Sequence, residues 1–253
     1  IEEGSMNLVQ GMFLNSSYEP LSKAEVRQAL CYAVNRDEIN QFMFGGKSRI
    51  IGTHMIPNMS VYYEPETEKV YSYDPQKAKQ LLADAGCPDG FDVDMTVSDL
   101  DMEGILLTDL AHKVKDDLSQ IGINVNIKTE AWAAGYGDEY RNGTLGFTVM
   151  YWGVDYSDPN VQLEFLPGGV VGQRAGWTAE KDPELAAMYQ EAMEATDDTA
   201  RADVLGKIQD AMYEDGPFIV IAQAPAHIAH STRLAGVDIF DSYTIDLTEI
   251  NVK

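Results

Sequence analysis

The feature that most constrains the fold of this chain is a repeated switch between two hydrophobic periodicities within residues 91–152. Phe91 to Val97 alternates apolar and polar residues, as expected for a half-buried strand. From Glu103 to Ile121 the apolar residues recur every three or four positions, which predicts an amphipathic helix. Ile123 to Ile127 alternates again, and Leu145 to Trp152 is a nearly continuous apolar run. This order predicts an α/β fold with helices packed on a sheet.

The apolar run from Leu145 to Trp152 is typical of a central strand that is buried on both faces. Further strands are expected over Gly11–Asn15, Phe218–Gln223 and Ala226–Ser231. Three further helices are expected from their start signals: Ser22 as a cap with Glu25 in the capping box, Asn35 with Asp37, and Asp74-Pro75. Three more are expected over Trp132–Arg141, Leu185–Ala195 and Ala200–Tyr213. Residues 47–72 contain prolines and many polar residues, and they predict an irregular segment.

Acidic residues outnumber basic ones along the whole chain. Of the 253 residues, 41 are Asp or Glu and 18 are Lys or Arg, so the formal net charge is −23. Such a surface repels phosphate backbones and anionic lipid, which argues against nucleic acid or a membrane surface as a partner. No apolar run approaches the roughly 18 residues of a membrane span. The chain starts without Met and without a signal peptide, so we expect a processed chain or a piece of a longer one.

Motifs for catalysis and metal binding fail on inspection. The segment Gly45-Gly46-Lys47-Ser48 resembles the end of a phosphate-binding loop, but the first glycine of that motif is replaced by Gln41. His227 and His230 are three apart in an expected strand, so their side chains point to opposite faces and do not share a metal. No nucleophile elbow or dinucleotide fingerprint is present. We therefore predict no catalytic residues, no metal and no cofactor.

Residues 150–160 combine aromatic and acidic side chains where a buried strand ends. Ligands of open α/β sheets bind at the carboxyl ends of strands. Trp152 and Tyr156 offer flat apolar surface, and Asp155 offers a negative charge, a combination that suits a ligand ammonium group. The alternative interpretation is structural, with Trp152 in the core, Asp155 in a surface turn and Asp158-Pro159 capping the next helix.

Several motifs in order resemble the carboxy-terminal half of an extracellular solute-binding protein of the dipeptide, oligopeptide and nickel class (family 5), the receptors of ABC importers. The similarity covers nearly all of residues 7–235. The motifs are Asn15 with Pro20, Val26–Leu30, Ala33–Asp37, Tyr73-Asp74-Pro75 with Lys77–Lys79, Leu81-Leu82, Ala85-Gly86, Asp89-Gly90-Phe91, Gly122-Ile123, Trp132, Tyr151-Trp152-Gly153, Asp158-Pro159 and Gly216–Ile219.

The resemblance implies one lobe of a bilobal, periplasmic-binding-protein-like α/β fold, with a mixed sheet flanked by helices and a ligand enclosed between two lobes. Residues 1–235 would form the second, ligand-binding lobe, and residues 236–253 a return segment that pairs with a first lobe absent from this chain. The family also implies bacterial origin and an extracellular or periplasmic location, with anchoring through a lipidated amino terminus outside this chain. An ABC permease is the implied protein partner.

The resemblance further implies a ligand site at Tyr151, Trp152, Gly153, Asp155 and Tyr156. Asp155 would pair with the α-ammonium of a peptide or other amine-bearing solute, and the backbone at Tyr151 and Gly153 would meet the peptide main chain as an added strand. Dipeptide-binding relatives place an Arg after the strand that matches 91–97, whereas Ser98–Glu103 contains no base here. That difference favours oligopeptides or another amine-bearing solute over a short dipeptide.

Three alternatives to a peptide receptor stay open from the sequence. One is a receptor of the same class for a nickel chelate or other non-peptide solute, although nickel-binding relatives tend to lack the acid at Asp155. The second is a hydrolase that uses Asp155 and Asp158 as an acid and base. The third is an interaction domain that binds a protein through its exposed cleft face.

Overall fold

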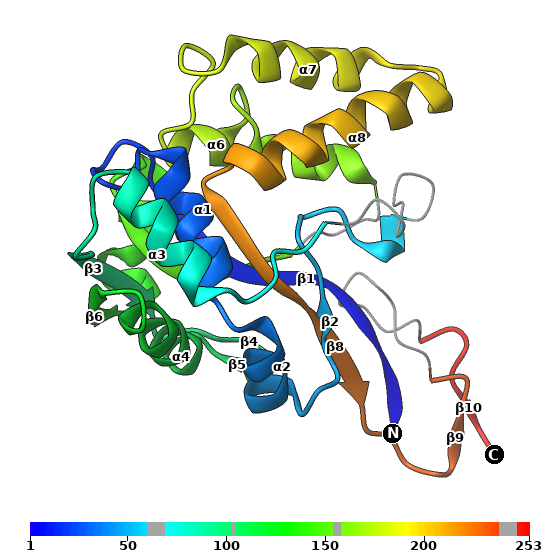
Figure 1. The fold of residues 1–253 in the computed structure, drawn as a ribbon. Helices are drawn as coiled ribbons and strands as arrows, with labels where there is room; N and C mark the ends of the chain where they lie inside the picture. The colour runs from blue at the N-terminus through cyan, green and yellow to red at the C-terminus, as the bar shows by residue number, and fades with distance from the viewer. Residues whose placement is uncertain (60–68, 103–104, 154–157, 238–246) are drawn as a thin grey trace.

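A computed structural model describes residues 1–59, 69–102, 105–153, 158–237 and 247–253 of the chain. It is an α/β structure with helices on both sides of a sheet, which confirms the expected fold class (Figure 1). Strands and helices are interspersed along the chain, and both parallel and antiparallel strand pairs are present. In the described part of the chain, none of the helices is long and apolar enough to cross a membrane.

The central sheet has four strands in the order β2-β8-β1-β7, and all its pairs are antiparallel. The long strands β1 (Glu2–Leu14) and β8 (Phe218–Ile228) run side by side through the middle of the molecule, although they come from opposite ends of the sequence (Figure 1). β2 (Arg49–Ile50) borders β8, and β7 (Phe147–Gly153) borders β1. The sequence predicts two separate closing strands, and β8 is one continuous strand that covers most of both.

The buried strand that the sequence places at the centre lies instead at the end of this sheet. β7 pairs with β1 from Leu8 opposite Gly153 to Leu14 opposite Phe147, and no described strand pairs with its other edge. Burial on both faces is nevertheless correct, because Val149 faces one hydrophobic cluster and Met150 faces the other. Helices cover both faces even at the end of the sheet.

The unit expected after residue 91 is present as β3 (Phe91–Ser98), α4 (Leu107–Ser119) and β6 (Ile123–Glu130). β3 and β6 are parallel, starting with Phe91 opposite Ile123, and α4 packs against both strands. The pair forms a separate small sheet, and β3 lies beside β7. The beginning of the expected helix, at residues 103–104, lies outside the described residues.

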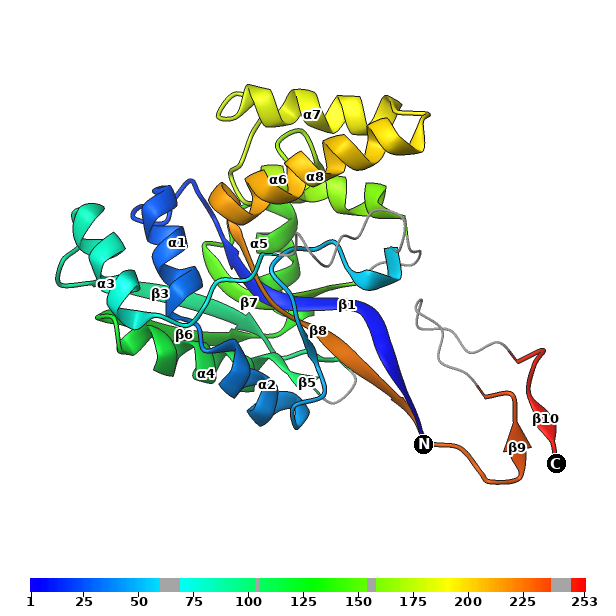
Figure 2. The ribbon, with the colours of Figure 1, turned by 45° about the vertical axis from the view of Figure 1, so that its right-hand side comes forward.

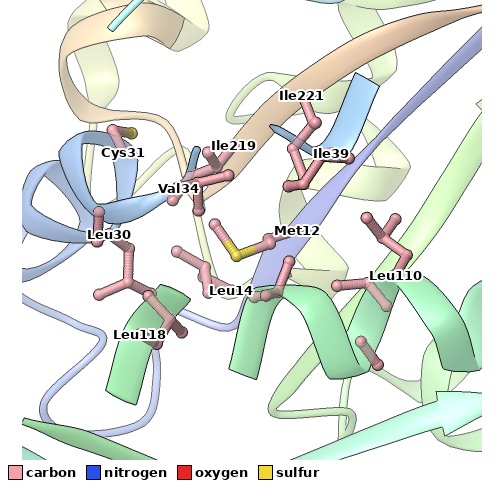
Figure 3. Close-up of a cluster of buried hydrophobic side chains, with 14 of the residues drawn as sticks. Met12, Leu14, Leu30, Cys31, Val34, Ile39, Leu110, Leu118, Ile219 and Ile221 are labelled. Atoms are coloured by element: carbon pink, nitrogen blue, oxygen red, sulfur yellow. The ribbon is translucent and has the colours of Figure 1, made fainter. Parts of the chain in front are cut away.

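Side chains of the central sheet alternate between two hydrophobic cores, one on each face. Met12 and Leu14 of β1 face the first core (Figure 3), as Leu8 does, whereas Val9 and Phe13 face the second. The helices against the first core are α1 (Ala24–Ala33), α2 (Arg36–Phe44), α3 (Pro75–Asp84) and α4. Those against the second core include η3 (Pro159–Phe165), α6 (Val170–Arg174), α7 (Pro183–Glu194) and α8 (Asp198–Asp215), on the opposite side of the sheet (Figure 2).

Two of the expected helix caps are confirmed, and one is wrong. The side chain of Asn35 accepts a hydrogen bond from the Glu38 backbone at the start of α2, and Asp74 caps α3. Lys23 occupies the cap position of α1 with no side-chain hydrogen bond, and Ser22 lies one residue before it and donates its hydroxyl to the Glu19 carboxylate. The helix begins one residue later than a Ser22 cap requires.

Short elements complete the structure. The helix expected over Trp132–Arg141 is divided at a kink at Gly135 into η2 (Trp132–Tyr136) and α5 (Gly137–Asn142). In the irregular 47–72 segment, only β2 and η1 (Pro57–Met59) are regular within the described residues. The remaining strands are the pair β4 (Asp101–Met102) and β5 (Ile105–Leu106) and the pair β9 (Leu234–Ala235) and β10 (Asn251–Val252).

Candidate functional site

A pocket of about 520 Å³ opens at the carboxyl end of β7. Tyr151, Trp152 and Gly153, three of the five predicted site residues, line it, while Asp155 and Tyr156 lie outside the described residues. The remaining lining residues come from β3 and the loop after it, α4, η2, α5, β7, η3 and α6: Ser98, Leu100, Leu107, Trp132, Tyr136, Tyr140, Met150, Glu164, Phe165, Val171 and Arg174. The end of the strand is thus part of a pocket built by distant segments.

Trp152 is both a core residue and a pocket residue. Its ring is buried in the second core, with ring centroids 5.6 Å from Phe165 and 5.9 Å from Phe218, both edge to face. Its indole Nε1 has no hydrogen-bond partner among the described residues. This nitrogen is itself buried, so Trp152 lines the pocket through other atoms.

Behind Trp152 lies a buried histidine that the sequence did not single out as a partner. His54 stacks on Phe165 with ring centroids 3.9 Å apart, and it meets Trp152 edge to face at 4.9 Å. Neither ring nitrogen has a hydrogen-bond partner in the described part of the chain. Burial lowers the pKa of His54 to about 3, so the ring is neutral near pH 7 and acts as an aromatic packing residue.

One wall of the pocket is aromatic and comes from η2 and α5. The hydroxyls of Tyr136 and Thr148 are 3.0 Å apart and buried, which fixes the Tyr136 ring. Burial raises the pKa of the Tyr136 hydroxyl, so it stays protonated. The Trp132 ring centroid is 5.6 Å from that of Tyr136, and Tyr140 packs edge to face on Phe13 of β1 at 5.8 Å. This wall offers flat apolar surface to a solute.

Two charged side chains that the sequence did not predict also line the pocket: Glu164 and Arg174. The guanidinium carbon of Arg174 lies 4.8 Å from the centroid of the Tyr140 ring. Burial raises the pKa of Glu164, and the positive charge of Arg174 opposes that shift. No ion pair within the described residues involves either side chain. No motif predicts these residues, because they reach the pocket only when η3 and α6 fold back over β7.

Asn15 holds that folded-back segment in place. Its buried side-chain amide donates to the backbone carbonyls of Gly143 and Leu145, each at 3.0 Å, and of Arg174 at 3.2 Å. The side-chain oxygen accepts a hydrogen bond from the Ser17 backbone. The end of β1 is thereby fixed to the start of β7 and to the last residue of α6. This residue positions the pocket although it does not line it.

The sequence leaves two roles open for Asp158, a helix cap or a catalytic acid or base, and the structure shows it as a helix cap. Its carboxylate accepts a hydrogen bond from the Asn160 backbone at 2.8 Å and caps η3, with Pro159 in the first turn. It also forms an ion pair with Arg201 of α8. The described residues also contain no group of three or more potential metal ligands.

Comparison with known proteins identifies relatives of the chain. Residues 2–172 match the family model described as bacterial extracellular solute-binding proteins, family 5 Middle. The chain is 28% identical over 237 residues to heme-binding protein A of Haemophilus influenzae, covering 93% of this chain and 43% of that protein. It is 26% identical over 232 residues to the dipeptide-binding protein of Escherichia coli, and this match covers 88% of this chain and 43% of that protein.

A solved structure shows the same fold. The structure of HbpA2 from Haemophilus parasuis superimposes with a TM-score of 0.86 at 22% identity, and the match covers 100% of this chain and 49% of that one. This chain therefore spans less than half the length of the two curated relatives and about half of the solved one.

Proposed function

Because this chain belongs to family 5 of the bacterial extracellular solute-binding proteins, we propose that it is the second lobe of a receptor for peptides or another amine-bearing small solute. Residues 1–235 would bind the solute, and residues 236–253 would return to a first lobe. The closed receptor would deliver the solute to an ABC permease. The relatives are solute-binding proteins rather than enzymes, so the hydrolase alternative is set aside.

The observation that carries the proposal is the pocket at the end of β7. Its aromatic wall and the charged side chains of Glu164 and Arg174 suit a solute with both apolar and polar parts. In this proposal an extended peptide would meet the backbone of Tyr151 and Gly153 at the carboxyl end of β7, although β3 lies beside this strand. Among the relatives, the dipeptide-binding protein of Escherichia coli supports a peptide solute.

In this proposal Asp155 pairs with the ammonium group of the solute. Asp155 follows Gly153 by two residues in the sequence, and Gly153 lines the pocket. Two lobes that close over a ligand exclude water from such a pair. Removing one partner of a buried charge pair costs about 2–5 kcal/mol, or roughly 30- to 5,000-fold in dissociation constant.

Calorimetry on the full-length protein with free and N-acetylated peptides tests this function. The peptides are identified beforehand by mass spectrometry of the solute that copurifies. Asp155→Ala should weaken a peptide with a free amino terminus by at least roughly tenfold. The acetylated peptide should bind the parent poorly and lose little in the variant. Asp116→Ala, which removes an exposed acid of α4, should change neither affinity.

The results of this experiment distinguish a failure of the Asp155 pairing from a failure of the peptide proposal. Equal losses for free and acetylated peptides would mean that Asp155 shapes its loop rather than pairing with an ammonium group. Copurification of a nickel chelate or a porphyrin instead of a peptide would contradict the peptide proposal and leave the family assignment intact.

A further inference from the structure

A second pocket, of about 330 Å³, lies where α1 begins and α8 ends (Figure 1). Ser16 lines it just after the end of β1, and that end of β1 pairs with the beginning of β7. The first pocket lies at the other end of β7, and none of the described residues lines both. The second pocket is therefore separate from the site proposed for the transported solute.

Arg27 lines the second pocket but is fully engaged within the protein. It is 5% exposed, and its guanidinium pairs with the Asp215 carboxylate at 2.6 Å. The same group donates to the backbone carbonyl of Asp215 at 2.7 Å and to those of Leu21 and Ser22 at 2.9 Å each. Its remaining donor, Nε, also binds the Asp215 carbonyl, at 3.2 Å. Arg27 therefore fixes and neutralises Asp215 and has no donor left for a ligand.

Two other side chains supply free donors to this pocket. Trp177 is 4% exposed, and its indole Nε1 has no hydrogen-bond partner among the described residues. Nε1 is not among the nitrogens that the fold seals from solvent, so it meets solvent at the pocket that Trp177 lines. Lys181 is exposed and forms no ion pair within the described residues, and its Nζ donates to the Ser16 carbonyl at 3.3 Å. Both groups can donate to a ligand oxygen.

The beginning of α1 adds backbone donors at the same place. Lys23 makes no side-chain cap, and the Ser22 hydroxyl donates to Glu19. The backbone N–H of Ala24, which lines the pocket, has no backbone acceptor in the described part of the chain. The positive end of the helix dipole therefore lies at this pocket without a capping side chain.

Asp182 and Asp215 supply acceptors opposite these donors. Asp182 uses Oδ1 to accept a hydrogen bond from the Leu185 backbone at 3.0 Å, and Asp215 uses Oδ1 for Arg27. The second oxygen of each carboxylate forms no hydrogen bond within the described residues. Burial raises the pKa of Asp215, Arg27 opposes that shift, and the charge of Asp182 adds to it. The two carboxylates thus lie near each other, each with one free oxygen.

We propose that this second pocket binds a small zwitterion of the size of a free amino acid. The ligand carboxylate accepts hydrogen bonds from Lys181, from the Trp177 indole and from the beginning of α1. The ligand ammonium group lies between the free oxygens of Asp182 and Asp215. A volume of about 330 Å³ is at the small end of the range for ligand pockets and suits such a molecule.

A zwitterion fits this pocket better than a simple ion does. The Arg27–Asp215 pair is neutral by itself, and Lys181 and Asp182 bring one charge of each sign. An anion alone would leave the two carboxylates without a donor, and a cation alone would meet Lys181 and the helix dipole. The inference stands independently of the proposed function, because it uses a different pocket.

Nuclear magnetic resonance of the tryptophan indole groups in the full-length protein tests this site. The Trp177 signal is identified by its loss in Trp177→Phe, which keeps a buried ring and removes the N–H. The standard free amino acids are titrated one at a time, and at least one should shift the Trp177 signal saturably. The N-acetyl derivative and the amide of that amino acid should each bind at least roughly tenfold more weakly, the effect of losing one charge-assisted hydrogen bond.

Variants that preserve the helix caps show whether the response comes from this pocket. Lys181→Gln removes an exposed charge, and Asp182→Asn removes a charge while asparagine still caps α7. Each should weaken binding of the amino acid at least roughly tenfold. Asp197→Asn makes the same change at the cap of α8, outside the pocket, and should leave the affinity unchanged.

Several results would overturn the second site. They are the absence of a saturable Trp177 shift with every amino acid, and shifts confined to Trp132 or Trp152, which line the first pocket. Equal binding of the free, acetylated and amide forms, or a response that survives both Lys181→Gln and Asp182→Asn, would contradict the zwitterion. Thermal melting checks that each variant is folded. Should Trp177→Phe unfold, calorimetry that compares Asp182→Asn with Asp197→Asn decides the question without the signal assignment.

Discussion

At the scale of single residues, the Asn15 amide shows how one buried polar group can position the segments around a pocket. Its two N–H bonds serve three backbone carbonyls, and only an amide supplies donors and an acceptor on one short side chain. The sequence marked Asn15 only as part of a family motif. Its hydrogen bonds to the chain near residues 143–145 and 174 exist only in the folded protein.

Replacing Asn15 with Asp should destabilise the chain strongly. The substitution places a carboxylate against three carbonyl oxygens and leaves buried acceptors without donors, which should cost at least about 2 kcal/mol of unfolding free energy. Urea denaturation measures the loss. Asn142→Asp makes the same change at an exposed position and should cost less than about 1 kcal/mol. Comparable losses in the two variants would show that the Asn15 hydrogen bonds contribute little.

The buried His54 should make stability depend on pH. Its folded pKa of about 3 lies below the usual value of 6.5, so the unfolded chain takes up a proton first as the pH falls. The stabilising contribution is therefore complete above pH 6.5 and is lost as the pH falls toward the folded pKa, at up to about 1.4 kcal/mol per pH unit.

His54→Phe removes this titration while keeping an aromatic ring in the cluster. The unfolding free energy of wild type minus that of the variant should be constant above pH 7 and should decrease steadily from pH 6.5 to pH 4. Denaturation at each pH measures it, with the exposed His112→Gln as the control for losing a histidine. A difference that does not change with pH would mean that His54 is not protonated on unfolding.

At the scale of elements, the close approach of the two turns that precede β3 and β6 fixes the parallel pair. Gly90 has φ +76°, and a Cβ built on it would lie 2.0 Å from the Gly122 carbonyl oxygen. The sequence indicates Gly122 as a helix stop. It does not indicate that Gly90 must be small, because that requirement arises only when β3 and β6 start side by side.

Gly90→Ala should therefore cost at least about 2 kcal/mol, from backbone strain at positive φ and from the clash with residue 122. Gly206→Ala is the matched control, because its position inside α8 has no atom within 4 Å of the added Cβ. Alanine there should stabilise the chain by about 0.5–1 kcal/mol. Thermal or urea unfolding compares the two, and a neutral Gly90→Ala would mean that the turns separate at little cost.

At the scale of the whole molecule, one sheet shared by two cores should make the chain unfold as a unit. β1 and β8 contribute side chains to both cores, through Met12 and Ile219 on one face and Phe13 and Phe218 on the other. Neither core can be lost without exposing the strands that the other one needs.

We therefore expect the isolated chain to fold cooperatively. Tryptophan fluorescence, which samples the second core through Trp152 and Trp177, should report the same urea midpoint as far-UV circular dichroism, which samples the helices on both faces. Two separated transitions, or a broad melt with strong binding of a hydrophobic dye, would contradict a single cooperative unit.

The sequence alone determined much of the local structure and predicted a site at the end of one strand. Hydrophobic periodicity acts over neighbouring residues, so it predicted β3, α4 and β6, and the apolar run predicted a strand ending at the pocket. The side-chain caps at Asn35 and Asp74 followed from the same local chemistry. The rule that ligands bind at strand ends, combined with the family resemblance, predicted site residues at Tyr151, Trp152 and Gly153.

Only the tertiary structure decided what depends on contacts between distant segments. β7 lies at the end of the sheet and β8, from the far end of the sequence, pairs with the other edge of β1, and no local pattern encodes these pairings. Glu164 and Arg174 belong to the pocket because η3 and α6 return over β7 and Asn15 holds them there. Their spacing in the sequence carries no signal, since side chains converge on a cavity through packing and not through periodicity.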